Sequence, residues 1–143
     1  MKVRNIFVFI VVLLFVIGCS RDQAKEVSIG EQIVRSYYTA LDAKDYQMMY
    51  GLISEGFKQI EPTAKDYNTF EAYMSKFYDT ATGISVERTT VTSAQESEIG
   101  VDYVAVIQLK NGEKKELKSS FTVRKKQEGW RLIHPYGQNI DNS

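Results

Sequence analysis

Few residues of this chain have side chains suited to acid–base or nucleophilic chemistry. His134 is the only histidine and Cys19 the only cysteine. A single cysteine cannot form an internal disulfide, a cysteine metal cluster or a dithiol redox pair. His134 is the one acid–base candidate, and it would need a carboxylate and a substrate cavity beside it. Because it ends the last predicted strand, next to Pro135, we expect a surface or partly packed role instead.

The carboxylates are scattered rather than clustered. Asp42 and Asp45 bracket a predicted turn between two helices, where capping is the expected use. Asp102 alternates with the apolar residues of its strand and should point away from the core. The sequence has no calcium-loop spacing, phosphate loop, dinucleotide glycine motif or nucleophile elbow. We therefore predict no catalytic residue, no metal and no cofactor.

Aromatic residues are the main candidates for ligand contact, since the chain has nine tyrosines, seven phenylalanines and one tryptophan. A pocket for a flat or apolar ligand would be lined by six of them: Tyr37, Tyr38, Tyr73, Tyr103, Phe121 and Trp130. Core packing is the alternative, which we favour because the tyrosines of the predicted helices follow helical spacing.

A group of basic residues falls on the last predicted hairpins: Lys114, Lys115, Lys118, Arg124, Lys125 and Lys126. Lys118 and Arg124 should lie on the outward face of one strand. Such a face could contact wall polymers or lipid headgroups. The alternative, which we favour, is a solvated edge whose lysines discourage aggregation.

The N-terminal stretch predicts export. Lys2 and Arg4 precede an unbroken apolar run of twelve residues from Ile6 to Ile17, which is typical of a signal peptide. A membrane-spanning helix needs about 20 such residues. The ending Val16-Ile17-Gly18-Cys19 resembles the lipobox of bacterial lipoproteins. That resemblance implies a diacylglycerol on the Cys19 sulfur and cleavage just before it. The alternatives are an uncleaved anchor and an ordinary secreted protein.

Cleavage would leave residues 19–143, of a length typical of one domain. Loss of Lys2 and Arg4 changes the balance from 18 basic and 18 acidic side chains to 16 and 18. This argues against a nucleic-acid partner, whose binders carry a basic excess. Membrane attachment would come from acyl chains. We expect a tether at 19–27, a domain at 28–137 and a tail at 138–143.

Three helices are predicted in the first half of the domain. The first begins with a capping box at Ser28 and Glu31 and runs to about Ala43. Asp45 would cap a second helix, from Tyr46 to Ile53, and Asn68 a third, whose apolar stripe reaches Ala81 before a stop at Gly83. Ser54 to Lys65 is predicted to be a connection.

After Gly83 the apolar period changes from about 3.6 to two. Four strands are predicted, at 84–94, 101–110, 116–124 and 130–134. Val86 and Val91 fall on opposite faces by simple alternation, so we expect a bulge or bend between them.

The turn at Asn111-Gly112 raises a parity problem. A two-residue hairpin there would pair odd with even positions, yet both neighbouring strands are apolar at odd positions. A slip of one residue would turn a whole hydrophobic set outward. We therefore predict an odd loop, such as three residues with Gly112 in the left-handed conformation, or a bulge close by.

The expected fold class is α+β, with three N-terminal helices packed on a curved four-stranded antiparallel sheet. The opening IVRSYYTALDAKDYQMMYGLISEGF, the hairpin VDYVAVIQLKNGEKKELKSSFTVRKKQEGWRLI and its Gly129-Trp130-Arg131-Leu132 ending resemble the nuclear transport factor 2-like, or cystatin-like cone, superfamily. They are most similar to its small extracytoplasmic members, which include lipoproteins and the N-terminal domain of some penicillin-binding proteins. The resemblance covers about Val27 to Tyr136.

This superfamily hosts enzymes, ligand binders and interaction modules, so the fold does not choose among them. We expect a lipid-anchored extracytoplasmic lipoprotein that acts as a non-enzymatic binding or assembly module at the cell envelope. Its partner would be a cell-wall protein, a wall polymer or a small apolar ligand. The alternative is a small-molecule carrier or a cone-cavity enzyme of the SnoaL-like type. The apolar inward strand positions favour the first hypothesis, because catalysis there would need converging titratable groups.

Overall fold

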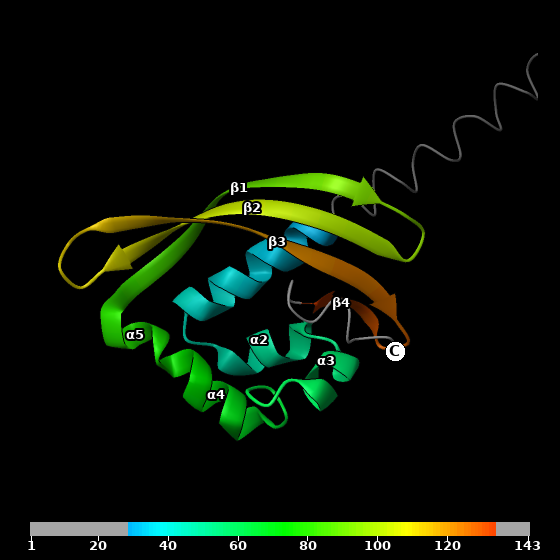
Figure 1. The fold of residues 1–143 in the computed structure, drawn as a ribbon, viewed down its shortest axis with the longest axis horizontal. Helices are drawn as coiled ribbons and strands as arrows, with labels where there is room; N and C mark the ends of the chain where they lie inside the picture. The colour runs from blue at the N-terminus through cyan, green and yellow to red at the C-terminus, as the bar shows by residue number, and fades with distance from the viewer. Residues whose placement is uncertain (1–28, 134–143) are drawn as a thin grey trace, which may run out of the picture.

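The structure, a computed structural model, describes residues 29–133 (Figure 1). Residues 29–42 are helical. The following elements are, in chain order, α2 (Tyr46–Leu52), α3 (Glu55–Ile60), α4 (Tyr67–Ser75), α5 (Phe77–Thr80), β1 (Ala81–Ala94), β2 (Glu98–Leu109), β3 (Lys114–Lys126) and β4 (Gly129–Ile133). The strands form one antiparallel sheet in the order β1-β2-β3-β4.

The sheet curves over the helix of residues 29–42, and the shorter helices lie below it on the same side (Figure 1). The predicted α+β layout is therefore confirmed, with two short helices added to the three that were expected. The predicted signal peptide, tether and tail lie outside the described residues.

Side-chain caps mark the starts of α2, α3 and α4. Asp45 Oδ1 accepts from the Met48 N–H at 2.9 Å, so its predicted cap on α2 is confirmed. The expected connection after α2 was wrong, because Ser54 Oγ accepts from the Phe57 N–H at 3.1 Å and starts α3. That helix has only six residues, too few for a hydrophobic period to show.

The start of α4 corrects another expectation. Its cap is Asp66, not Asn68, and the Asp66 carboxylate accepts from the Thr69 N–H at 2.8 Å and the Thr69 hydroxyl at 3.0 Å. Asparagine and aspartate are both good caps. Residue type alone therefore could not decide between two candidates that lie two positions apart.

Gly83 was predicted to stop a helix, but in the structure it is part of β1. A Cβ at this position would lie 2.8 Å from Asp42 Oδ1. The same oxygen accepts from the Ile84 N–H at 2.8 Å. Asp42 was expected to cap a helix, but its side chain instead links the end of the 29–42 helix to the first strand by a hydrogen bond. The glycine at position 83 permits this close approach.

The predicted irregularity in the first strand is confirmed. The β1–β2 register shifts between Val86 and Arg88, and both Val86 and Val91 pack against the core as a result. Arg35 supports this bulge from the helix, because its guanidinium donates to the Val86 carbonyl at 3.2 Å and to Thr89 Oγ1 at 3.0 Å. Two further shifts, near Gly83 and Val91, help the long strand to bend.

The hairpin between β2 and β3 has the predicted odd parity. Val101 pairs with Phe121 and Ile107 with Lys115. The loop is closed by the Leu109 N–H, which donates to the Glu113 carbonyl at 2.8 Å, and Gly112 has φ +87°. Three residues therefore lie between the closing pair, with the glycine left-handed, so the apolar sets of both strands reach the same face.

Candidate binding surface on the sheet

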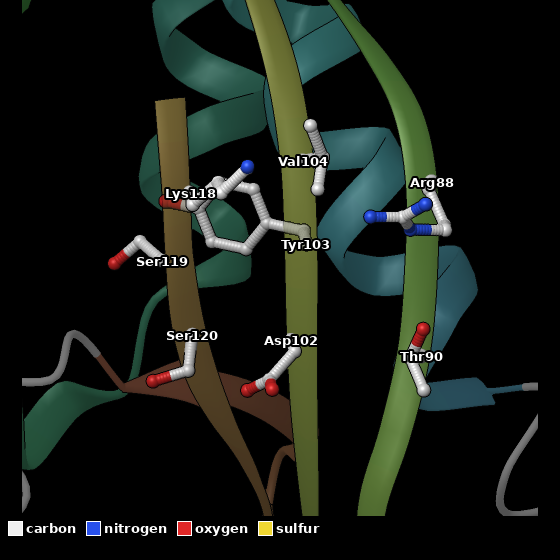
Figure 2. Close-up of a pocket in the computed structure, with 8 residues that line it drawn as sticks. All are labelled: Arg88, Thr90, Asp102, Tyr103, Val104, Lys118, Ser119 and Ser120. Atoms are coloured by element: carbon white, nitrogen blue, oxygen red, sulfur yellow. The ribbon is translucent and has the colours of Figure 1, made fainter. Parts of the chain in front are cut away.

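The sheet face opposite the helices carries a hollow of about 530 Å³ (Figure 2). Six of its lining residues form two cross-strand rows, Arg88–Val104–Lys118 and Thr90–Asp102–Ser120. Tyr103 and Ser119, one residue pair between the rows, complete the lining. We call this feature the outer hollow.

Local sequence explains why these residues share a face. In β2 and β3 the apolar residues that pack in the core are at odd positions, so the even positions turn outward. In β1 the bulge after Val86 reverses the parity, and Arg88 and Thr90 therefore join the outward set. The bulge thus serves both faces, since it keeps the valines in the core and adds β1 to the outer hollow.

The first row has an apolar centre between two cations. Figure 2 shows the Arg88 guanidinium and the Lys118 ammonium extending toward Val104 from opposite sides. Val104 is only 9% exposed although it lies on the outer face. Long basic side chains commonly cover apolar surface with their stems while their charges stay in water, and here they leave Val104 as the floor of the outer hollow.

The second row places a carboxylate between two hydroxyls. Asp102 pairs with Thr90 on one side and Ser120 on the other. Within residues 29–133, neither Asp102 nor Arg88 has an ion-pair partner. Lys118 contacts Glu116 at 2.7 Å, but the two side chains are 69% and 51% exposed, so water screens this pair strongly.

The outer hollow is therefore equipped for binding polar groups of both signs. Its serine and threonine hydroxyls have no histidine beside them in the part of the chain that the structure describes. Among residues 29–133, no three histidine, cysteine or carboxylate side chains gather as a metal site would require. In the same residues, no helix combines the length and apolarity needed to cross a membrane.

The structure brings four of the six predicted pocket residues together inside the core. Tyr37, Tyr38, Tyr103 and Phe121 are each 7% exposed or less. Tyr103 stacks on Phe121 with ring centres 5.2 Å apart, and Tyr38 lies 5.1 Å from Tyr103. These rings contact one another under the sheet, and we call them the aromatic cluster.

The aromatic cluster contains one polar contact. The hydroxyl oxygens of Tyr38 and Tyr103 lie 2.5 Å apart. Burial raises the pKa of Tyr38 well above its ordinary value of 10.0, and the neighbouring Tyr103 raises it further. The Tyr38 hydroxyl therefore stays neutral, so it offers a hydrogen bond but no charge to the interior.

The other two predicted pocket residues lie apart from the aromatic cluster. Tyr73 is 50% exposed on α4, where it borders a shallow hollow with Met74, Lys76 and Phe77. Trp130, on β4, is partly buried against the core, and the Lys125 ammonium lies 5.9 Å from the centre of its ring.

Of the predicted basic group, only Lys118 lines the outer hollow. Arg124 is on the same face but pairs with Glu98 at 2.9 Å. The predicted lipidation site Cys19 and the acid–base candidate His134 lie outside the described residues.

Sequence reasoning named Tyr103 as a pocket residue and placed Asp102 and Lys118 outward correctly. It missed the other residues that line the outer hollow, Arg88, Thr90, Val104, Ser119 and Ser120. Alternation along β3 could have added Ser120, two positions from Lys118. Nothing in the sequence could place Arg88, because its face depends on where the β1 bulge lies.

Comparison with known families finds one match. Residues 30–135 match the sequence model of the family described as NTF2-like N-terminal transpeptidase domain. No curated protein matches the chain. The match spans both the helices and the whole sheet, so it includes the outer hollow and the aromatic cluster.

Several solved structures have a similar fold. A putative aromatic ring hydroxylase from Novosphingobium aromaticivorans is 11% identical with a TM-score of 0.57, over 78% of this chain and 86% of that one. A ketosteroid isomerase-like protein from Erwinia carotovora atroseptica is 15% identical with a TM-score of 0.56, over 76% and 92%. The association domain of C. elegans CaMKII is 22% identical with a TM-score of 0.50, over 77% and 95%. At such identities the likeness concerns the fold alone.

Proposed function

We propose, since the chain belongs to the family of NTF2-like N-terminal transpeptidase domains, that it is a non-enzymatic binding or assembly module of the cell envelope. The outer face of the sheet is its contact surface. The fold hosts enzymes as well as binders, so the proposal rests on how the two faces of this sheet differ.

The observation that carries the proposal is the position of the unpaired polar groups. The aromatic cluster fills the space under the sheet with rings that contact one another. The outer hollow instead presents Arg88 and Asp102 to solvent, and neither has an ion-pair partner within residues 29–133. Charges left unpaired on an open surface are available to a partner at a low cost in desolvation.

The proposed address is the outer side of the cytoplasmic membrane. It rests on the leader and on the lipobox-like Val16-Ile17-Gly18-Cys19. A diacylglycerol supplies two acyl chains, which anchor far more firmly than one. We expect the native protein to have the mass of a chain that starts at lipid-modified Cys19, and Cys19→Ser to release it from membranes. Recovery of the unprocessed leader would contradict this address.

The expected partner is a polar wall component, either a protein or a polymer, rather than a small apolar ligand. The outer hollow carries charges of both signs and the hydroxyls of Thr90, Ser119 and Ser120 around one buried aliphatic residue, Val104. Interfaces of this composition recognise partners through complementary charge more than through buried apolar area.

The test is cross-linking of the anchored protein in intact cells, followed by purification and mass spectrometry. We expect one envelope component to be recovered with the native chain and lost with Arg88→Gln or Asp102→Asn. Lys114→Met and Asp79→Asn are matched controls, because both residues are exposed and lie outside the outer hollow. Recovery that is indifferent to Arg88 and Asp102 would contradict the proposed contact surface.

The same experiment addresses the carrier or enzyme alternative. A small apolar molecule that copurifies with the native chain, and is lost when Tyr37 or Tyr38 is changed to a smaller residue, would place the ligand under the sheet, because neither residue lines the outer hollow. That result would replace the proposal with a cone-cavity function.

A further inference from the structure

The outer hollow keeps a positive and a negative group on neighbouring rows, and we infer from this that it binds a short zwitterionic peptide about two residues long. The inference rests on the proposed use of the outer face as the contact surface, and it adds the chemical class of what is bound. The carboxylate of the peptide would lie at the Arg88 row and its ammonium at the Asp102 row.

The spacing of the two rows sets the length of the ligand. Val104, which centres the cationic row, is two residues from Asp102 on β2. At about 3.4 Å per residue, the rows are therefore about 7 Å apart. Two residues of extended peptide also span about 7 Å. A free amino acid, with about half that reach, could satisfy only one row at a time.

Each row has the chemistry for one terminus. A guanidinium can hold a carboxylate through two parallel hydrogen bonds, and Lys118 adds a second cation across Val104. An ammonium has three donors. Asp102 can accept one of them, and the hydroxyl of either Thr90 or Ser120, its cross-strand neighbours, can accept another.

The pairing within the outer hollow leaves room for this ligand. Arg88 and Asp102 are on the same face without forming an ion pair with each other. The contact of Lys118 with Glu116 is mostly exposed, so a ligand carboxylate can compete with it at small cost. Asp102 would repel a ligand that carries only negative charge, which favours a zwitterion over a simple anion.

The inference is tested by amide NMR of the full chain in detergent micelles, titrated with alanyl-alanine. The comparison ligands are its N-acetylated form, its C-terminal amide and free alanine. We expect shifts centred on residues 88–90, 102–104 and 118–120, and a loss of affinity of about fivefold to tenfold on blocking either terminus, as for one exposed charge-assisted contact. Equal affinity for blocked and unblocked peptides would overturn the inference.

Two variants assign each terminus to its row. Asp102→Asn should lower affinity for the free peptide and leave affinity for the acetylated peptide unchanged. Arg88→Gln should lower affinity for the free peptide and leave affinity for the amidated peptide unchanged. The matched controls Asp79→Asn and Lys114→Met should bind as the native chain does. If acetylation and Asp102→Asn weaken binding independently, so that their effects add, the assignment is wrong.

The outcome is separable from that of the proposed function. If cross-linking in cells depends on Arg88 and Asp102 but no dipeptide perturbs the outer hollow, the contact surface stands and the ligand class is wrong. Dipeptide binding without any such cross-link would support the inference and contradict an assembly role.

Discussion

The two faces of the sheet differ in burial and polarity, although both are formed by the same alternating strands. Inward, Tyr103 and Phe121 stack on each other and meet Tyr37 and Tyr38 from the helix, and every one of these rings is buried. Outward, the very next residues, Asp102, Val104 and Ser120, line an open hollow. The side chains of the inner face are buried against one another in the core. The polar side chains of the outer face remain accessible to a partner.

This difference separates stability from binding along each strand. A substitution at an inward position removes contacts that nothing else replaces, because protein interiors are close-packed. A substitution at an outward position changes a solvated group, with small effects on folding. Four predictions use this contrast, in order of decreasing effect on stability.

The largest effect is expected from Phe121→Ala. Phe121 is 1% exposed and contacts Tyr37, Tyr38 and Tyr103, so its loss leaves a cavity that costs about 3–5 kcal/mol of unfolding free energy. Ser120→Ala, its outward neighbour, should cost less than about 0.5 kcal/mol. Urea unfolding measures both, and similar losses at the two positions would remove the contrast between the faces.

The next effect is expected from Gly83→Ala. The added Cβ would lie 2.8 Å from Asp42 Oδ1, which accepts from the Ile84 N–H. We expect a loss of about 1–3 kcal/mol, the cost of disturbing a partly buried hydrogen bond. In an Asp42→Ala background the same change should cost much less, because the clashing oxygen is gone. Additive effects in this double-mutant cycle would refute the proposed contact.

A smaller effect concerns pH. The folded-state pKa of Tyr38 is raised by burial and then by Tyr103, so the neutral hydroxyl stabilises the fold fully below the unfolded pKa of 10.0, and this contribution is lost as pH rises above it. Stability should therefore fall above pH 10, and Tyr38→Phe should make that fall shallower. Some fall will remain, because the pKa values of Tyr50 and Tyr78 are also raised by burial. An unchanged slope in Tyr38→Phe would show that Tyr38 is not the buried group.

The smallest effect is expected on the outer face. Arg88→Gln and Asp102→Asn should each change unfolding free energy by less than about 0.5 kcal/mol, because both residues are exposed and lack ion-pair partners within residues 29–133. Thermal unfolding of each variant measures this. A loss of unfolding free energy above about 1 kcal/mol would mean that the residues of the outer hollow stabilise the fold rather than being available for binding.

The sheet could be predicted well from the sequence because one face is almost entirely apolar, with Ser119 as a polar exception. Odd positions from Val101 to Leu109 and from Leu117 to Val123 fix which way each strand turns, and a wrong register would expose all of them. This parity alone predicts the odd hairpin at Gly112, which the structure confirms.

Short and irregular features could not be predicted in the same way. The helix α3 spans less than two turns, and its start depends on Ser54, one of many serines. The β1 bulge accepts a hydrogen bond from Arg35, a helical residue 51 positions from the Val86 carbonyl. Sequence patterns carry local periods, so contacts at that separation do not appear in them.

The candidate site was harder to predict than the fold for the same reason. The large aromatic residues were candidates for a pocket or, as we favoured, for core packing, and Tyr37 and Phe121 are buried to about 1% exposure. The outer hollow is built from small and charged residues on three different strands. None of these is unusual alone, and only the register between strands brings Arg88, Asp102 and Lys118 to one place.

The most direct test places a photo-cross-linking amino acid at Thr90 in the outer hollow and, separately, at Tyr73 on α4, where the side chain is also exposed. In cells that carry the anchored protein, we predict that the Thr90 probe forms an adduct with one envelope component and that adding Asp102→Asn abolishes it. The Tyr73 probe should give no such adduct. An adduct from Tyr73 alone, or one from Thr90 that survives Asp102→Asn, would contradict the assignment of the outer sheet face as the binding surface.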